Sequence, residues 1–402
     1  MYSTTPKGLR LHIAIFGRTN VGKSSLLNCL TQQDVSIVSS IPGTTTDPVE
    51  KPMELLPIGP VLFIDTAGLD DISSLGNLRI QKTIKVFDRA DIIILVIEPN
   101  IWTDYEEFVI NTAKKYNTPL LVILNKIDVI DPKEEILEYL KQKNINFVKV
   151  SSIKKSWQTT DIVKSKLIEL LPEDFIKPSS LIPDGLAKEE DFVVLVIPID
   201  KEAPKGRIIL PQQQVLRELL DKKVNVLVTN EKNLAYSITQ LNKKPKLVIT
   251  DSQVFEEVLK SVPKDILITS FSILFARIKG DIYEYIKGVK TIETLQDKDT
   301  ILIAESCTHH PIGDDIGRNK IPRWIKQKIN KDIEVEVFSG KDFPENLKKY
   351  KLIIQCGGCM TNRKEILSRI YKAKSQNVPI TNYGIVIAYL KNGLEESTRL
   401  FK

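Results

Sequence analysis

A glycine-rich stretch near the N-terminus, GRTNVGKS over Gly17–Ser24, constrains the fold more than any other part of the sequence. It fits the pattern G-x-x-x-x-G-K-[ST], in which two glycines let successive N–H groups point at one phosphate. The apolar run Leu11–Phe16 predicts a strand directly before it, and Ser24–Leu30 predicts an amphipathic helix directly after it. The helix N-terminus adds its positive dipole end. The stretch therefore predicts a phosphate-binding loop, with Lys23 reaching the outer phosphates and the Ser24 hydroxyl binding Mg²⁺.

Apolar strands alternate with helical stretches through the first 172 residues, which is typical of a parallel sheet with helices on both faces. Besides the strand before the glycine-rich loop, we expect strands at Val61–Ile64, Ile92–Ile97, Leu120–Leu124 and Phe147–Val150. In such sheets the functional residues lie in loops after the C-terminal ends of the strands.

Three further short motifs follow predicted strands in this way. Asp65-Thr66-Ala67-Gly68 offers a carboxylate for Mg²⁺ and a glycine whose N–H can approach a γ-phosphate. In Asn125-Lys126-Ile127-Asp128, the Asp carboxylate can accept hydrogen bonds from guanine N1–H and its amine, which adenine does not offer. Ser151-Ser152 can contact the guanine oxygen through backbone N–H groups. The expected nucleotide-binding residues are Gly17, Arg18, Thr19, Asn20, Val21, Gly22, Lys23, Ser24, Ser25, Asp65, Thr66, Ala67, Gly68, Asn125, Lys126, Asp128, Ser151 and Ser152.

In this order the motifs resemble those of translation-factor-type GTPases, closest to the branch that contains Era and MnmE. The resemblance implies that Thr45 of the segment Gly43–Asp47 is the switch threonine that binds Mg²⁺, although the adjacent Thr44 and Thr46 also fit. Lys23, Thr45 and Gly68 are then the expected catalytic residues.

Two residues bear on the rate of hydrolysis. Leu69 stands where Ras-like GTPases carry the glutamine that orients the attacking water, so intrinsic hydrolysis is expected to be slow. The resemblance implies that Asn20 helps to hold K⁺, which would supply the charge of an arginine finger. The alternative is that a variable loop position simply tolerates Asn.

Residues 173–290 predict a second, smaller parallel α/β domain without a catalytic motif. A proline-containing stretch from Leu171 to Gly185 is a candidate linker, and Pro204–Arg207 is expected to be a solvated basic turn. Strands are expected at Asp191–Ile199, Asn225–Thr229, Lys246–Thr250 and Ile266–Ile268, and helices at Gln212–Leu220, Leu234–Leu241, Val254–Leu259 and Ser272–Lys287.

Residues 291–402 predict a third α/β domain in which two strands end near cysteines. Thr300–Ala304 precedes Cys307, and Leu352–Gln355 precedes the pair Cys356 and Cys359. If these strands are neighbours, the three thiols can meet at one edge of a sheet. A thioredoxin-like pair would leave Cys307 unexplained. A structural Zn²⁺ site and an iron–sulfur cluster both favour soft thiolates, so the residue types alone do not separate them.

The whole chain resembles the FeFe-hydrogenase maturation GTPases, in which a GTPase domain precedes a motif-poor domain and a cysteine-bearing domain. The resemblance implies three α/β domains: a GTP-binding domain (1–172), a dimerisation domain (173–290) and a 4Fe–4S domain (291–402). It implies that Cys307, Cys356 and Cys359 bind the cluster. It also implies a homodimeric scaffold that carries a two-iron subcluster precursor between radical-SAM maturases and the apo-hydrogenase. Its cofactors would be GTP, Mg²⁺, K⁺ and the cluster.

The fourth cluster ligand is open, because Gln355 stands where this family often has a histidine. His309 matches the remaining family histidine and is the first choice. Glu305 at the same strand end is the second, and a water or exogenous ligand is the third. His310, which precedes a proline, is expected to be structural.

Composition limits the alternatives. The net charge of +6 is spread along 402 residues, and neither a base-stacking platform nor a basic stripe is visible, so no nucleic-acid partner is expected. Apolar runs are too short for a membrane span, and the expected location is the cytoplasm. The main alternative is a tRNA-modification or ribosome-assembly GTPase with a C-terminal Zn site. A further alternative is a Zn-stapled switch that binds partners according to its nucleotide state.

Overall fold

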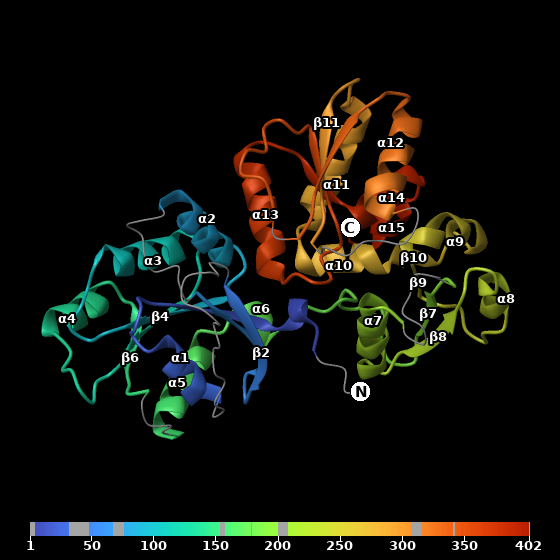
Figure 1. The fold of residues 1–402 in the computed structure, drawn as a ribbon. Coiled ribbons are helices and arrows are strands. Elements are labelled where there is room, and N and C mark those ends of the chain that lie inside the picture. The colour runs from blue at the N-terminus through green and yellow to red at the C-terminus, as the bar shows by residue number, and fades with distance from the viewer. Residues whose placement is uncertain are drawn as a thin grey trace. The chain divides into compact units, whose positions relative to one another are not determined.

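A computed structural model of the protein divides into two compact units, Met1–Pro178 and Ser179–Lys402 (Figure 1). The residues that it describes are 5–31, 48–66, 76–152, 157–177, 179–199, 208–306, 315–340 and 342–401. In these ranges no helix combines the length and the apolar character needed to cross a membrane.

The first unit is built on a six-stranded sheet with the order β2-β3-β1-β4-β5-β6. All neighbouring strands pair in parallel except β2 and β3, which are antiparallel. The strands are β1 (Leu11–Phe16), β2 (Val49–Leu55), β3 (Gly59–Asp65), β4 (Ile92–Ile97), β5 (Leu120–Leu124) and β6 (Asn146–Lys149). The helices are α1 (Lys23–Thr31), α2 (Gly76–Phe87), α3 (Asp104–Lys115), α4 (Glu134–Gln142), α5 (Trp157–Glu169) and α6 (Glu173–Ile176).

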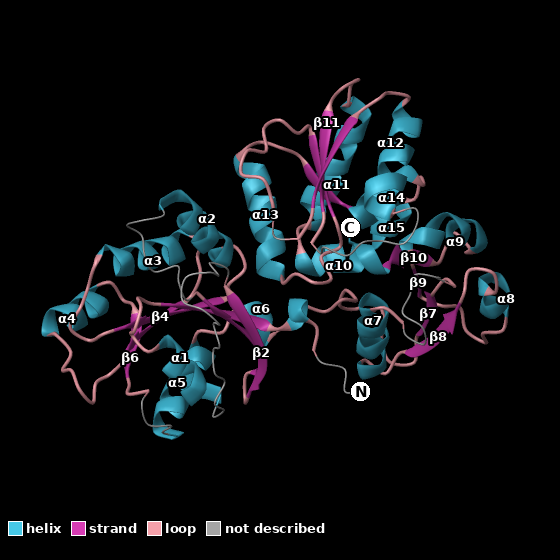
Figure 2. Ribbon diagram, in the orientation of Figure 1, coloured by secondary structure: helices cyan, strands magenta, loops and turns pink. Residues whose placement is uncertain are grey.

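Alternate residues of β1 point to opposite faces of this sheet, so both faces need a helical cover. Ile13 and Ile15 share a buried cluster with residues of α1 and α5. Ala14 and Phe16 share another with residues of α2, α3 and α4, and Phe16 stacks on Phe87 with ring centroids 4.9 Å apart. The predicted sheet with helices on both faces is confirmed (Figure 2).

The edge strand β2 is the element of this sheet that the sequence does not predict. Its residues, VEKPMEL, carry three charges and a proline, which contradict the usual composition of a buried strand. Pro52 has no N–H to donate, and the position is tolerated because, among the described strands, β2 pairs only with β3.

The second unit contains two four-stranded parallel sheets, ordered β10-β9-β7-β8 and β12-β11-β13-β14. Their strands are β7 (Phe192–Val196), β8 (Asn225–Thr229), β9 (Leu247–Thr250), β10 (Leu267–Ser270), β11 (Thr300–Ala304), β12 (Glu334–Phe338), β13 (Leu352–Gln355) and β14 (Ile380–Asn382). The helices are α7 (Leu210–Asp221), α8 (Leu234–Thr239), α9 (Phe255–Ser261), α10 (Phe271–Lys279), α11 (Ile282–Val289), α12 (Ile321–Ile329), α13 (Arg363–Ser375), α14 (Tyr383–Leu390) and α15 (Leu394–Thr398). The predicted fold class, a GTPase-type sheet followed by two parallel α/β sheets, is confirmed.

One hydrophobic core joins these two sheets. Val194 and Val248 of the β7 sheet belong to the same buried cluster as Ile301 and Ile353 of the β11 sheet. Helix α10 contacts α7 and β10 on the side of the first sheet, and α13 and α14 on the side of the second. The helix is therefore shared by the two halves of the unit.

The predicted helical stretch Ser272–Lys287 is two helices, because the chain stops and restarts at Gly280 and Asp281. Gly280 follows the end of α10 in an extended conformation that no helix continues. The Asp281 side chain accepts hydrogen bonds from the N–H groups of Tyr283 and Glu284, both at 3.1 Å, and so caps α11.

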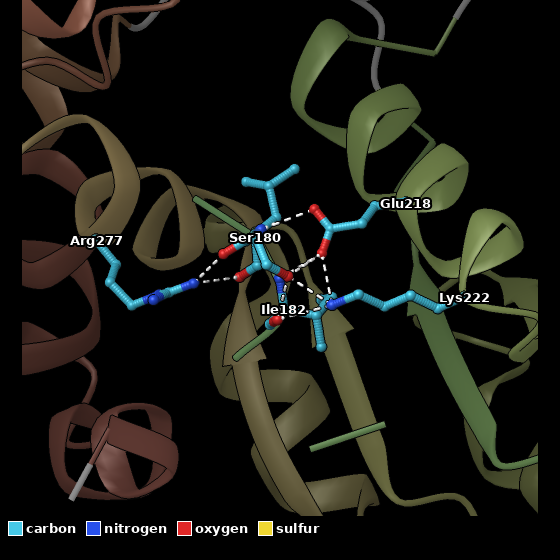
Figure 3. Close-up of polar contacts among 6 residues, drawn as sticks. Ser180, Ile182, Glu218, Lys222 and Arg277 are labelled. Carbon is cyan, nitrogen blue, oxygen red and sulfur yellow. Dashed lines mark hydrogen bonds and ion pairs between the residues drawn. The ribbon is translucent and has the colours of Figure 1, made fainter. Parts of the chain in front are cut away.

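The start of the second unit is anchored by α7 and α10, although the sequence suggests a linker there (Figure 3). Glu218 accepts hydrogen bonds from the Ser180 hydroxyl and the Ile182 N–H, and Lys222 donates to the Ile182 carbonyl. Burial acts to raise the pKa of Glu218, but these hydrogen bonds lower it below its ordinary value. From the other side, Arg277 of α10 donates to the carbonyl of Ser180.

Candidate functional site

The predicted phosphate-binding loop connects β1 with α1, which begins at Lys23. Gly17 and Gly22 have φ angles of +147° and +96°, which other residues rarely adopt. A Cβ on Gly17 would lie 2.3 Å from the Val96 carbonyl oxygen, and one on Gly22 would lie 2.3 Å from Asn125 Nδ2. Backbone conformation and close approach both require glycine at these two positions, so the loop has the geometry that the pattern predicts.

Lys23 lies across this loop with its side chain buried. Its amine donates to the carbonyl oxygens of Gly17 and Arg18, the second at 2.8 Å. Ser24 and Ser25 are exposed in the first turn of α1. The Lys23 ammonium group lies at the loop, and the exposed Ser24 hydroxyl lies at the N-terminus of α1. These two groups suit the binding of a polyphosphate with its Mg²⁺ ion.

Asn125 brings three predicted motifs together at the C-terminal edge of the sheet. Its Nδ2 donates to the Val21 carbonyl oxygen at 2.9 Å, and its Oδ1 accepts from the Ser152 N–H at 3.0 Å. It thus supports both the phosphate loop and the segment expected to contact guanine. The adjacent Lys126 forms an ion pair with Glu98.

The remaining described motif residues lie at the ends of their predicted strands. Asp65 is buried at the end of β3, opposite Ile15 in the parallel register, and the Thr66 hydroxyl donates to the Ile15 carbonyl at 2.7 Å. Asp128 is exposed beyond β5, as a base-reading carboxylate needs to be. The predicted residues Thr45, Ala67 and Gly68, with Leu69 and the segment 43–47, lie outside the described residues.

Helix α3 supplies contacts to the phosphate loop that sequence reasoning missed. The Gly17 N–H donates to the Tyr105 hydroxyl at 3.3 Å, and Arg18 pairs at 2.8 Å with Glu106, which is fully buried. Glu106 also accepts from the Thr103 N–H in a capping box at the start of α3. The T-x-x-E spacing could have indicated this helix start, but not its contact with the loop.

The strands that precede the cysteines, β11 and β13, are parallel neighbours, as a thiol site shared between them requires. Cys356 directly follows β13, and its N–H donates to the Ala304 carbonyl at 2.9 Å. The Ser306 N–H donates to Cys356 Sγ at 3.1 Å. Cys307, the next residue in sequence, and His309 lie outside the described residues.

The turn that carries Cys356 and Cys359 is held by a glycine and a lysine. Gly358 has a φ angle of +62°, and its carbonyl oxygen accepts from Lys279 Nζ at 2.6 Å. The Thr361 carbonyl accepts from the same amine at 3.0 Å. Burial lowers the pKa of Lys279 to about 8, although the neighbouring Cys359 and Cys356 act in the opposite direction.

Glu305, the second choice for the fourth metal ligand, is engaged elsewhere, and so is Gln355, which stands where the family often has a histidine. Glu305 accepts hydrogen bonds from Arg318, the shortest at 2.6 Å, and from the Ser339 hydroxyl at 2.8 Å. Gln355 is buried and donates to the Tyr285 hydroxyl inside the core. The amide at this position therefore faces the core, and the Glu305 carboxylate is already neutralised by a guanidinium.

The donor set fits a metal that prefers thiolates. Cys356 and Cys359 are free thiols, the second of them exposed, and a main-chain N–H already donates to one sulfur. Within the described ranges, no group of three or more His, Cys, Asp or Glu side chains is arranged around one point; two of the predicted ligands fall in the gap 307–314. Cys29 is a buried thiol of the first unit, and its Sγ lies 3.7 Å from the Thr160 hydroxyl oxygen.

Replacing Gly358 with alanine is expected to destabilise the cysteine turn. The new Cβ would lie 2.7 Å from Ile366 Cδ1 in a left-handed backbone conformation, which costs about 1–3 kcal/mol. Gly357 is the matched control, since a Cβ there meets nothing within 4 Å. Thermal unfolding of the full chain should show a lower midpoint for G358A than for G357A. Equal unfolding midpoints for the two variants would contradict the prediction that a side chain at position 358 strains the turn.

Comparison with known protein families separates the two units. Residues 12–126 match the family model described as 50S ribosome-binding GTPase. Residues 181–280 match the hydrogen maturase F dimerization domain, and residues 283–400 match the hydrogen maturase F tetramerization domain. The two maturase matches together cover more than half of the chain.

Curated relatives match up to about half of the chain. GTPase Era from Caldanaerobacter subterraneus subsp. tengcongensis is 28% identical over 226 residues, which are 53% of this chain and 73% of Era. The tRNA modification GTPase MnmE from a Picosynechococcus species is 42% identical over 127 residues, which are 31% of this chain and 27% of MnmE. The crystal structure of Aquifex aeolicus Era bound to GDP and AlF4⁻ is 23% identical and covers 55% of this chain and 93% of Era. Its TM-score is 0.34.

The matches fit the site geometry, in which a guanine nucleotide loop in one unit is accompanied by a cysteine turn in the other. The chain belongs to the hydrogen maturase F family, with an N-terminal domain that binds GTP with Mg²⁺ and hydrolyses it and with family domains for self-association.

Proposed function

We propose that this chain is a GTP-hydrolysing scaffold in FeFe-hydrogenase maturation that binds a 4Fe–4S cluster and delivers a two-iron subcluster precursor to the apo-hydrogenase. The observation that carries the proposal is the cysteine turn at the C-terminal edge of the β11–β13 pair. There the residue before Cys307 donates its N–H to Cys356 Sγ at 3.1 Å. Chain connectivity therefore favours a third thiol near the other two.

The proposed ligands are Cys307, Cys356 and Cys359, with His309 as the fourth. Arg318 and Ser339 occupy the Glu305 carboxylate, which favours His309 over Glu305. When bound, the cluster would supply a metal corner at which a fragment can be accepted and released. The protein's own part is to present the thiolates on one turn and to donate a main-chain N–H to sulfur.

The GTPase unit would act as the control element. Nucleotide binding would order the loops around residues 43–47 and 65–69 and so change the affinity for partners, without taking part in cluster chemistry. The proposed partners are the radical-SAM maturases, the apo-hydrogenase and a second copy bound through residues 181–280. The proposed compartment is the cytoplasm, because thiolate-bound clusters need reducing conditions.

The K⁺ proposal predicts that GTP hydrolysis is faster in KCl than in NaCl at equal ionic strength. About a tenfold difference corresponds to ~1.4 kcal/mol of transition-state stabilisation. Asn20 has a φ angle of +66°, so Asn20→Gly preserves the backbone conformation and removes only the carboxamide. This variant should lose the K⁺ stimulation. Equal rates of the unmodified protein in the two salts would exclude the K⁺ role and leave Asn20 as a left-handed loop residue.

The scaffold proposal predicts that anaerobic reconstitution with iron and sulfide gives a brown protein with charge-transfer absorption. Cys356→Ser and Cys359→Ser should each lose most of the bound iron. Cys29→Ser, which alters a buried thiol of the other unit, is the control and should keep it. His309→Ala should change the cluster's EPR spectrum, and Glu305→Gln should leave it unchanged.

Other outcomes would reject parts of this proposal. Tight, colourless Zn²⁺ binding in place of iron would favour the Zn-stapled switch or the RNA-acting GTPase. An EPR spectrum unchanged in both the His309 and Glu305 variants would leave a water or exogenous molecule as the fourth ligand.

A further inference from the structure

Lys279 is the last residue of α10 and lies against the cysteine turn. Its side chain is only 6% exposed, and its Nζ donates to the carbonyl oxygens of Gly358 at 2.6 Å and Thr361 at 3.0 Å. These two carbonyls flank Cys359 in sequence. One buried ammonium group therefore holds the turn at two points on either side of a proposed ligand.

The charge of this lysine lacks a carboxylate partner. Among the described residues, no Asp or Glu oxygen lies within ion-pair distance of Lys279 Nζ, and both of its hydrogen-bond acceptors are main-chain carbonyls. Burying an ammonium group is costly unless opposite charge compensates it. The groups that can become anionic and whose charges act on Lys279 are the thiols of Cys359 and Cys356 and the carboxylate of Glu365.

The element that presents Lys279 is fixed from both sides. Arg277, two residues earlier on α10, donates to the carbonyls of Ser180 and Leu181, the second at 3.2 Å (Figure 3). Arg363, at the start of α13, donates to the Ile278 carbonyl at 2.8 Å. The ammonium group is thus delivered by a rigid helix end and not by a mobile loop.

The contact also joins the two maturase family matches. Lys279 falls within residues 181–280 and the cysteine turn within residues 283–400. A change in the packing of α10 would therefore act on the turn through the two hydrogen bonds of Lys279.

We propose that Lys279 is a positioning residue for the cluster site, which fixes the Cys356–Cys359 turn through two carbonyls and places one positive charge beside the thiolate-bound cluster. The charge part of this inference rests on the proposed function, because it needs the cluster. One-electron reduction adds a negative charge to a cluster, and a nearby ammonium group stabilises the reduced form. Lys279 should therefore raise the reduction potential of the cluster.

The test uses the full chain with Lys279→Met, which removes charge and donors, and Lys279→Gln, which keeps a polar amide. The control is Lys331→Met. Lys331 Nζ likewise donates to a main-chain carbonyl, that of Leu295 at 2.7 Å, but before the N-terminal ends of β11 and β12. Far-UV circular dichroism establishes that each variant is folded.

Two measurements are made on each variant. In the metal-free protein, hydrogen exchange of the amides in residues 356–362 should be about tenfold faster in both Lys279 variants, the effect of losing a hydrogen bond from a charged donor. In reconstituted protein, an EPR-monitored reductive titration should give a more negative potential for both Lys279 variants and an unchanged value for Lys331→Met.

Unchanged exchange and potential in both Lys279 variants would overturn the inference, as would an equal change in the Lys331 control. If the unmodified protein took up no cluster, the proposed function would fail. The exchange measurement would still decide whether Lys279 positions the turn.

Discussion

Parallel pairing of β11 with β13 is the constraint on which the cysteine site depends. Ala304 lies opposite Gln355 in this pair, so the two strands end at the same edge and the residues after them meet. The hydrogen bond from Ser306 to Cys356 Sγ is the direct result. A change in the register between β11 and β13 would move the Cys356 thiol away from Ser306. The Ser306 N–H would then lose its sulfur acceptor.

The first unit uses the same constraint with different residues. β1, β3 and β5 are parallel and end at one edge, where the phosphate loop follows β1, Asp65 is the last residue of β3, and Asn125 follows β5. Asn125 then joins the loop to Ser152 by two hydrogen bonds. In both units the parallel sheet brings the functional residues to one edge. Short turns with positive φ angles then let the backbone come close to the proposed ligand. The chemistry differs because one edge carries main-chain N–H groups and an ammonium group for phosphate, and the other carries thiols.

Sequence reasoning predicts the elements whose signal is an uninterrupted apolar run. β1, β4, β5, β11 and β13 have the expected bounds. β2 was missed because an edge strand with one neighbour tolerates charges and a proline. The break between α10 and α11 depends on the cap at Asp281, which a helical pattern does not show.

The sequence predicts only those residues of the candidate site whose type and spacing fit a known motif. Glycines, Lys23 and the cysteines fit patterns with known roles, whereas Lys279 is one of 57 Lys and Arg residues in the sequence. The residues around Lys279 in the sequence do not show that its side chain is buried. Nor do they show that it donates to the carbonyl of Gly358, which lies 79 positions later. The same holds for the Tyr285–Gln355 and Arg318–Glu305 contacts, which exist only once the chain is folded.

In the proposed function the GTPase unit exerts control, and the last part of the chain holds the metal cluster. The most direct test is the iron content and cluster EPR spectrum of reconstituted Lys23→Ala, measured beside its GTP hydrolysis rate. We expect that hydrolysis is lost, because the amine that contacts the phosphate loop is gone, while the iron content and the EPR spectrum equal those of the unmodified protein. Loss of the cluster in this variant would contradict the division of roles between the two units.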